Sequence, residues 1–60
     1  MLELWIAVDK NGTICLFNSK PMRHYSMYVD GGECVQITKD IMIKLIGKEL
    51  TWEDEPVQIN

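Results

Sequence analysis

The sequence has little of what marks secreted, membrane-spanning or nucleic-acid-binding proteins. It contains two cysteines, two prolines and no apolar run near the roughly 20 residues that a membrane-spanning helix needs. A disulfide-stapled secreted domain of this size usually carries about four or more cysteines. Basic residues are also scarce, since six lysines and arginines stand against nine acidic residues, for a net charge of −3. We therefore expect no membrane span and no nucleic-acid partner.

The start of the chain and its cysteines predict a cytoplasmic protein. Met1–Trp5 has neither the basic segment nor the small-residue cleavage site of a secretory signal peptide. Thiols stay reduced in the cytosol, so we expect Cys15 and Cys34 to be free and mostly buried, where they pack as small apolar side chains. Their spacing leaves open whether the two thiols are close in space.

What the chain does contain is the composition of one small folded domain, residues 1–60. Apolar residues make up 47% of it and charged residues 25%, which is typical of a globular protein rather than a disordered one. A core this small leaves a narrow margin of stability. A partner chain is a common remedy for that shortage.

An alternating pattern near the N-terminus predicts a β-hairpin. From Leu2 to Val8 apolar residues recur at every second position, as in a strand with one buried face. Asp9–Gly12 is a strong turn sequence. Thr13–Phe17 follows as a second strand rich in β-forming residues.

The faces of these strands decide between two turns. A two-residue loop would pair Val8 with Cys15. A type I turn with Gly12 in a left-handed bulge instead pairs Val8 with Ile14, which keeps the aliphatic residues on one face and gives Trp5 an aromatic neighbour. We predict the bulged turn.

The middle of the chain predicts a second hairpin. Asn18–His24 is expected to be a connection, because Pro21 cannot donate a ladder hydrogen bond. Tyr25–Val29 and Glu33–Ile37 then alternate around the turn sequence Asp30–Gly32, which predicts two further strands joined by that turn.

The C-terminal third predicts a helix and a closing strand. Thr38 suits a helix N-cap, apolar residues of 39–47 fill about half of a helical wheel, and Gly47 suits the end of the helix. The β-branched isoleucines leave a strand over 39–47 open as the alternative. Val57–Asn60 is predicted as an edge strand. The fold class is therefore α+β: an antiparallel meander sheet of four or five strands, in two hairpins, with one short helix packed on one face.

No catalytic, cofactor-binding or metal-binding pattern is present. Cys15, Cys34 and His24 are the available soft ligands, but they lack the paired spacing of a zinc site. Both cysteines lie in predicted strands, which favours inert packing over nucleophilic chemistry. The turn at Gly12 resembles the centre of a calcium-binding loop, yet Asn18 then stands where such a loop needs a glutamate. We expect a protein that is not an enzyme and holds no cofactor or metal.

Two stretches are candidates for partner binding. One is basic and aromatic, and it could hold phosphates and stack bases as single-strand binders do. The other is an acidic turn beside Trp52, which suits a basic protein surface. Their candidate residues are Lys20, Arg23, His24, Tyr25 and Tyr28 in the first stretch, and Glu53, Asp54 and Glu55 in the second.

These features favour a small protein-interaction module, an accessory or inhibitory protein that acts by binding. The alternative is a nucleic-acid-binding protein that uses the Lys20–Tyr28 stretch. An open sheet also has two edges with unpaired backbone groups. We therefore predict a homodimer, formed by edge pairing or by packing of the helix face.

Four segments together carry a resemblance: Leu4–Gly12, Lys20–Arg23, Gly31–Glu33 and Leu50–Val57. In the positions of their turns and tryptophans they resemble a set of short uncharacterised proteins encoded by gut Bacteroides-type bacteria and by their phages and mobile elements. The resemblance covers most of the chain. It implies a cytoplasmic protein of mobile-element origin, and it transfers no functional residue.

Overall fold

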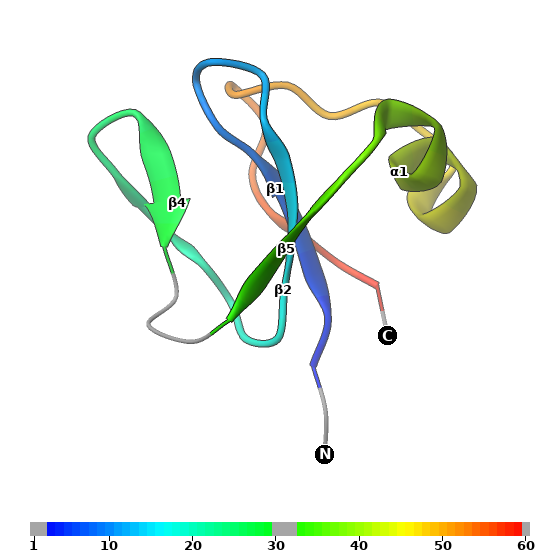
Figure 1. Cartoon of the computed structure of the whole chain (residues 1–60), viewed down its shortest axis with the longest axis horizontal. Helices are drawn as coiled ribbons and strands as arrows, with labels where there is room; N and C mark the ends of the chain where they lie inside the picture. The colour runs from blue at the N-terminus through cyan, green and yellow to red at the C-terminus, as the bar shows by residue number, and fades with distance from the viewer. Residues whose placement is uncertain (1–2, 30–32, 60) are drawn as a thin grey trace.

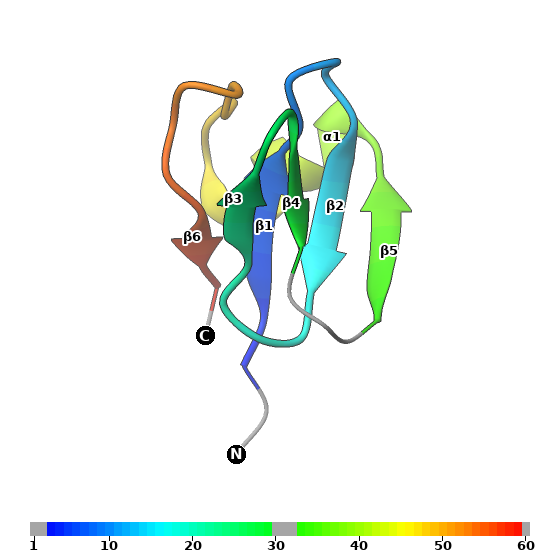
Figure 2. The same ribbon diagram turned by 90° about the vertical axis from the view of Figure 1, so that its left-hand side faces the viewer.

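The computed structural model describes residues 3–29 and 33–59, and these form three layers (Figure 1). The elements are β1 (Trp5–Val8), β2 (Ile14–Phe17), β3 (Met22–His24), β4 (Met27–Val29), β5 (Cys34–Ile37), α1 (Lys39–Ile46) and β6 (Val57–Gln58). The middle layer is a four-stranded antiparallel sheet in the order β5-β2-β1-β6. The β3–β4 hairpin lies on one side of this sheet and α1 on the other (Figures 1 and 2). The predicted α+β class, with an antiparallel sheet and a short helix, is confirmed.

The first hairpin has the predicted register and the predicted turn. Val8 lies opposite Ile14. Gly12 has a φ of 92°, in the left-handed region, and its N–H donates to the Asp9 carbonyl at 2.9 Å. The Asp9 N–H donates in turn to the Thr13 carbonyl at 2.8 Å. The proposed start of the first strand at Leu2 lies outside the described residues, and β1 begins at Trp5.

Strand β1 is buried on both faces, so its alternating side chains build two separate cores. One core lies between the sheet and α1, and the other lies between the sheet and the β3–β4 hairpin. Ile6, Val8, Met42 and Leu50 form the first core. Ala7, Cys15, Phe17 and Tyr28 form the second, with Trp5 and Trp52 packed against it.

The helix begins and ends at the predicted residues. The Thr38 hydroxyl oxygen accepts from the Ile41 N–H at 3.3 Å, as an N-cap does. Gly47 has a φ of 76°, and its N–H donates to the Ile43 carbonyl at 2.7 Å, which is a left-handed C-terminal cap. Met42 of the helix is fully buried and packs against the sheet. The strand alternative for this segment is wrong.

The second hairpin differs from the prediction. Met22–His24 forms strand β3 rather than part of a connection, and it pairs with β4 across a turn at Tyr25 and Ser26. The predicted strand from Tyr25 therefore begins only at Met27. Pro21 comes directly before β3 and so removes no ladder hydrogen bond.

The predicted pairing of β4 with β5 is also wrong. Strand β5 pairs with β2, where Ile37 lies opposite Ile14 and Val35 opposite Leu16. This register keeps aliphatic residues on the α1 side of the sheet, and β4 is left free to cover the other side. The predicted turn at Asp30–Gly32 lies outside the described residues. The predicted closing edge strand is present over Val57–Gln58, while Asn60 lies outside the described residues.

Gly12 provides a test of the bulged turn. Apart from Gly12 itself and its two neighbours in the chain, no residue has an atom within 4 Å of the place that a Cβ on Gly12 would occupy, so any penalty comes from the backbone conformation. We expect Gly12→Ala to lower the free energy of unfolding by about 1 kcal/mol or more, measured by denaturant titration. A chemically synthesised chain with D-alanine at this position is the control, since D-residues favour positive φ. An equal loss in both variants would contradict the assigned turn.

Candidate interaction surface

The β3–β4 hairpin is attached to the sheet through the turn of the first hairpin. The Tyr28 N–H donates to Asp9 Oδ1 at 2.8 Å, and the Lys10 N–H donates to the Ser26 carbonyl at 3.0 Å. The Tyr28 side chain is buried in the same cluster as Phe17. Backbone bonds and a buried ring thus fix which side of the hairpin faces the sheet.

The basic stretch and the acidic turn, predicted separately as partner-binding features, contact each other. The Arg23 guanidinium carbon lies 4.1 Å from the centre of the Trp52 ring and 5.3 Å from that of Tyr28. Arg23 Nη2 donates to Tyr28 Oη at 2.8 Å and also to the Trp52 carbonyl. Tyr28 Oη donates to the Asp54 carbonyl at 3.2 Å. Arg23 and Tyr28 therefore hold the C-terminal loop against the hairpin.

The acidic turn is organised mainly by its own hydrogen bonds. Asp54 Oδ2 accepts from the Thr51 N–H at 2.8 Å and from the Thr51 hydroxyl at 3.2 Å. The Asp54 carboxylate is therefore engaged within its own turn, whereas Glu53 and Glu55 are exposed. Glu55 also lines a shallow hollow with Lys20 and Arg23.

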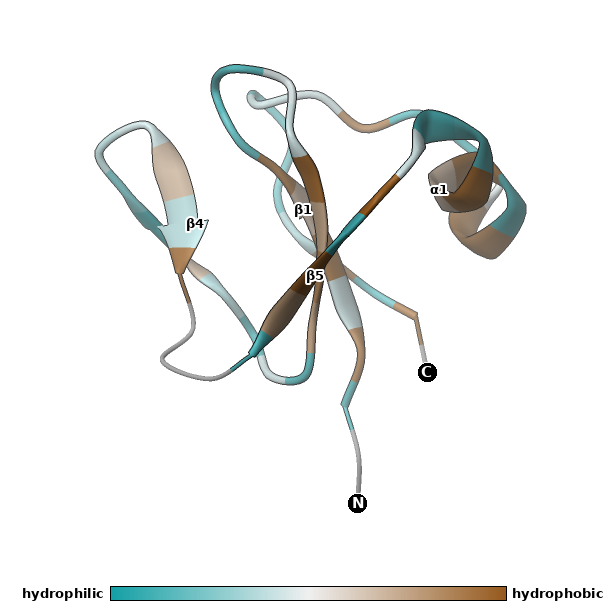
Figure 3. Cartoon of the chain, viewed as in Figure 1, coloured by the Kyte–Doolittle hydropathy of each residue, from teal (hydrophilic) through white to brown (hydrophobic). Residues whose placement is uncertain are grey.

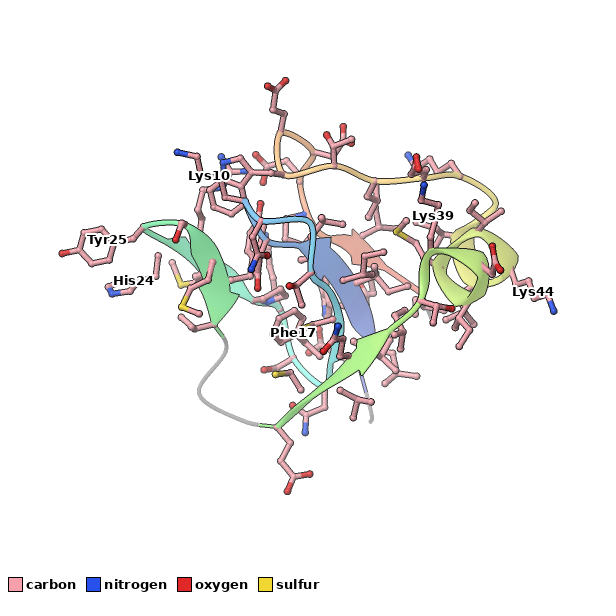
Figure 4. The ribbon with its side chains drawn as sticks, turned by 45° about the horizontal axis from the view of Figure 1, so that its top comes forward. Lys10, Phe17, His24, Tyr25, Lys39 and Lys44 are labelled. Carbon is pink, nitrogen blue, oxygen red and sulfur yellow. The ribbon has the colours of Figure 1, made fainter. Side chains whose placement is uncertain are left out.

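The other predicted residues lie apart from this cluster. Lys20 Nζ lies 5.7 Å from the centre of the Trp5 ring. His24 and Tyr25 contact each other edge to face, with ring centres 4.5 Å apart. Both project from the end of the hairpin, away from the sheet (Figure 4). Of the basic and aromatic stretch, His24 and Tyr25 are thus the residues turned outward.

The outer side of the hairpin is an exposed apolar surface. Tyr28 is buried and Arg23 is exposed, but both contact Trp52 on the sheet side of the hairpin. Because side chains alternate along a strand, the neighbouring pairs face outward. Those pairs are Met22 with Val29 and His24 with Met27. The exposed fractions are 73% for Met22, 48% for Met27, 42% for Val29 and 88% for Tyr25. We name Met22, His24, Tyr25, Met27 and Val29 the hairpin face.

Sequence reasoning finds His24 and Tyr25 but not the exposure of Met22 and Val29. The signal is the alternation of Met22 and His24 on one side of Arg23. It is hidden when Asn18–His24 is treated as a connection, because a connection has no faces.

Tyr25 has an uncommon backbone conformation. Its φ of 57° lies in the left-handed region, and it is the one non-glycine residue with positive φ in residues 3–29 and 33–59. Such a position in a two-residue hairpin turn normally belongs to glycine, and for a bulky residue it is strained. A large, exposed ring is thus held at the tip at a cost in stability.

A groove of about 630 Å³ lies elsewhere, between the first hairpin turn, α1 and the loop before Trp52. Its floor includes Val8, Met42 and Leu50, and its rim includes Lys39 and Glu49. Lys39 Nζ and Glu49 Oε1 pair at 3.2 Å, so the two rim charges largely offset each other.

The two cysteines are close together but differ in exposure. Cys15 is buried as predicted, whereas Cys34 is exposed, so the expectation of two buried thiols is wrong for Cys34. Burial above all, and then the neighbouring Cys34 and Asp9 side chains, raise the pKa of the Cys15 thiol to about 11. A thiol with that pKa remains protonated near neutral pH and is a poor nucleophile or metal ligand.

Two further kinds of feature are absent from residues 3–29 and 33–59. No group of three or more histidine, cysteine, aspartate or glutamate side chains in these ranges is arranged to hold a metal ion. No helix within these ranges is long enough and apolar enough to cross a lipid bilayer.

Comparison with known proteins gives no match among family models, curated proteins or solved structures.

Tyr25→Gly tests the strain at the hairpin tip. A left-handed conformation costs an L-residue roughly 1–2 kcal/mol, and the greater unfolded-state entropy of glycine offsets about 0.5–1 kcal/mol of that relief. We therefore expect Tyr25→Gly to raise the free energy of unfolding by about 0.5 kcal/mol, measured by denaturant titration. The neighbouring Ser26→Gly is the control and should lower it. A loss of stability in Tyr25→Gly would show that the tyrosine is not strained.

The cysteines provide a second test. At pH 8 we expect iodoacetamide to modify Cys34 in the folded protein while Cys15 stays unmodified, because Cys15 is buried and its raised pKa leaves little thiolate. Peptide mass spectrometry locates the label, and labelling in denaturant, where both thiols should react, is the control. Preferential labelling of Cys15 in the folded state would contradict the assigned environment.

Proposed function

We propose that this chain is a small, non-enzymatic, cytoplasmic protein-interaction module that binds another protein through the hairpin face. In this role it is an accessory or inhibitory protein, and its resemblance to proteins of mobile elements fits such a role. The observation that carries the proposal is the hairpin face itself: an exposed apolar surface on the outer side of a hairpin that the buried Tyr28 anchors to the sheet.

Three properties of the hairpin face support a protein partner. Met22 and Met27 are flexible, polarisable side chains of the kind that protein-binding surfaces use to fit varied contours. Tyr25 adds a large ring, and aromatic residues are enriched at the centres of interfaces. Behind the surface, the buried Tyr28 ring and its hydrogen bond to Asp9 fix the hairpin, so little order must be gained on binding.

Charge indicates the chemistry of the partner surface. Residues 21–29 include Arg23 and His24 but no acidic residue, although the chain as a whole has a net charge of −3. The surface that fits the hairpin face is therefore apolar at its centre and neutral or acidic at its rim.

The nucleic-acid alternative has less support. It requires Arg23 and Tyr28 to contact phosphates and bases, but Arg23 stacks on Trp52 and Tyr28 is 5% exposed. Lys20, His24 and Tyr25 would have to carry the binding in an acidic chain.

The experiment compares two charge-introducing variants. Met27→Glu places a carboxylate on the hairpin face, and Ile43→Glu places one on the outside of α1, where Ile43 has a similar exposed fraction of 40%. A partner is captured with the unmodified chain from bacterial extract, identified by mass spectrometry, purified, and titrated calorimetrically. We expect Met27→Glu to weaken binding at least tenfold and Ile43→Glu to leave it unchanged, with circular dichroism confirming that both variants fold.

Two results would contradict the proposal. Equal weakening of partner binding by both variants would show that the hairpin face is not the contact surface. Capture that nuclease treatment abolishes, together with salt-sensitive binding of labelled single strands, would favour the nucleic-acid alternative instead.

A further inference from the structure

Strand β5 is an open edge of the sheet. It is the outermost strand in the order β5-β2-β1-β6, and Figure 2 shows no other described element along its outer side. Its four residues carry no charge and no proline, and Val35 is 61% exposed. In Figure 3 most of this strand has the colour of hydrophobic residues. An edge of this kind is able to pair with a further strand.

The first hairpin turn fixes which backbone groups of β5 point outward. The Asp9 N–H donates to the Thr13 carbonyl, and hydrogen-bonded pairs alternate along an antiparallel ladder. The backbone groups of Cys15 therefore bond to β1, and those of Ile14 and Leu16 bond to β5.

The same alternation carries across to β5. Ile14 lies opposite Ile37, and Leu16 lies opposite Val35, so these two residues of β5 bond to β2. The N–H and C=O groups of Cys34 and Gln36 then point to the open edge.

The opposite edge of the sheet is protected. Strand β6 has two residues, and Pro56 precedes it directly. A short strand beside a proline is a common way to block edge pairing. Of the two edges of the sheet, β5 is thus the one whose backbone N–H and C=O groups are available to pair with another strand.

We propose that β5 pairs antiparallel with β5 of a second copy of this chain, with Gln36 on the two-fold axis. The outward groups of β5 allow a symmetric pairing centred on either Val35 or Gln36. Centring on Val35 would place Glu33 opposite the apolar Ile37 of the second copy. Centring on Gln36 instead places Val35 opposite Ile37 on both sides of the axis, so that apolar side chains face apolar side chains and Glu33 faces no residue of the second copy's β5.

This pairing is isologous, so it closes on itself and gives a dimer with one continuous sheet rather than a filament. The β3–β4 hairpin covers a face of the sheet and not its edge, so the hairpin face stays available in the dimer. The inference is therefore independent of the function proposed above.

Sedimentation equilibrium tests the dimer. We expect the 7.0 kDa chain to reach twice its mass as concentration rises. Val35→Lys should weaken association at least tenfold, because it places a charge opposite the apolar Ile37 of the second copy, next to the two-fold axis. Ile43→Lys, on α1, is the matched control and should not weaken it. A species of 7.0 kDa at every concentration, or a dimer that Val35→Lys leaves intact, would overturn the proposal.

A cysteine cross-link tests the register. In a chain with Cys15→Ala and Cys34→Ser, an added Gln36→Cys brings two thiols together across the two-fold axis. Mild oxidation should then give a covalent dimer, whereas Gln58→Cys on β6 should not. Equal cross-linking of both variants would overturn the register.

Met27→Glu separates this inference from the proposed function. It should leave the dimer intact. If Met27→Glu abolishes the dimer, the two copies associate through the hairpin face and not through β5.

Discussion

The burial of strand β1 on both faces is the constraint on which the rest of the structure depends. Ile6 and Ala7 are adjacent in sequence, point to opposite sides of the sheet, and are both almost fully buried. Each side therefore needs its own cover, and a chain of 60 residues supplies each cover with only one small element. The helix covers one side through Met42, and the β3–β4 hairpin covers the other through Tyr28.

The helix and the β3–β4 hairpin are each a single layer, so each has an outer side exposed to solvent as well as an inner side packed on the sheet. In a two-stranded hairpin, every second residue faces away from the core, so fixing Arg23 and Tyr28 inward necessarily turns their neighbours toward solvent. In most small domains those positions are polar, whereas here Met22, Met27 and Val29 occupy them. The apolar content of the chain exceeds what its two cores take up, and the excess lies on the hairpin face, on β5 and on the outside of α1. Large exposed apolar patches mark protein-interaction surfaces or ligand-binding sites, and the two proposals above depend on this surplus.

The Arg23 contacts show how long-range packing changes the meaning of a sequence motif. A basic residue among aromatic ones suggests a surface for phosphates and bases, but here Trp52, far along the chain, supplies the aromatic face and carbonyl that engage it. Cation–π contacts of this sort contribute about 0.5–1 kcal/mol when exposed and more when desolvated. The arginine thus joins the hairpin to the C-terminal loop, and the binding proposed above depends on the residues on the other side of the same strand.

The sequence by itself determined the parts of this protein that local chemistry controls. The bulge at Gly12, the register it imposes on β1 and β2, and the caps of α1 at Thr38 and Gly47 each depend on residues only a few positions apart. The tertiary structure alone decided that β5 pairs with β2 and β4 with β3. Alternation shows that a strand has two faces but does not identify its neighbour, because strands with similar patterns fit one another almost equally well. The need to cover both sides of β1 determined which strands pair. The same pairing leaves Met22 and Val29 exposed.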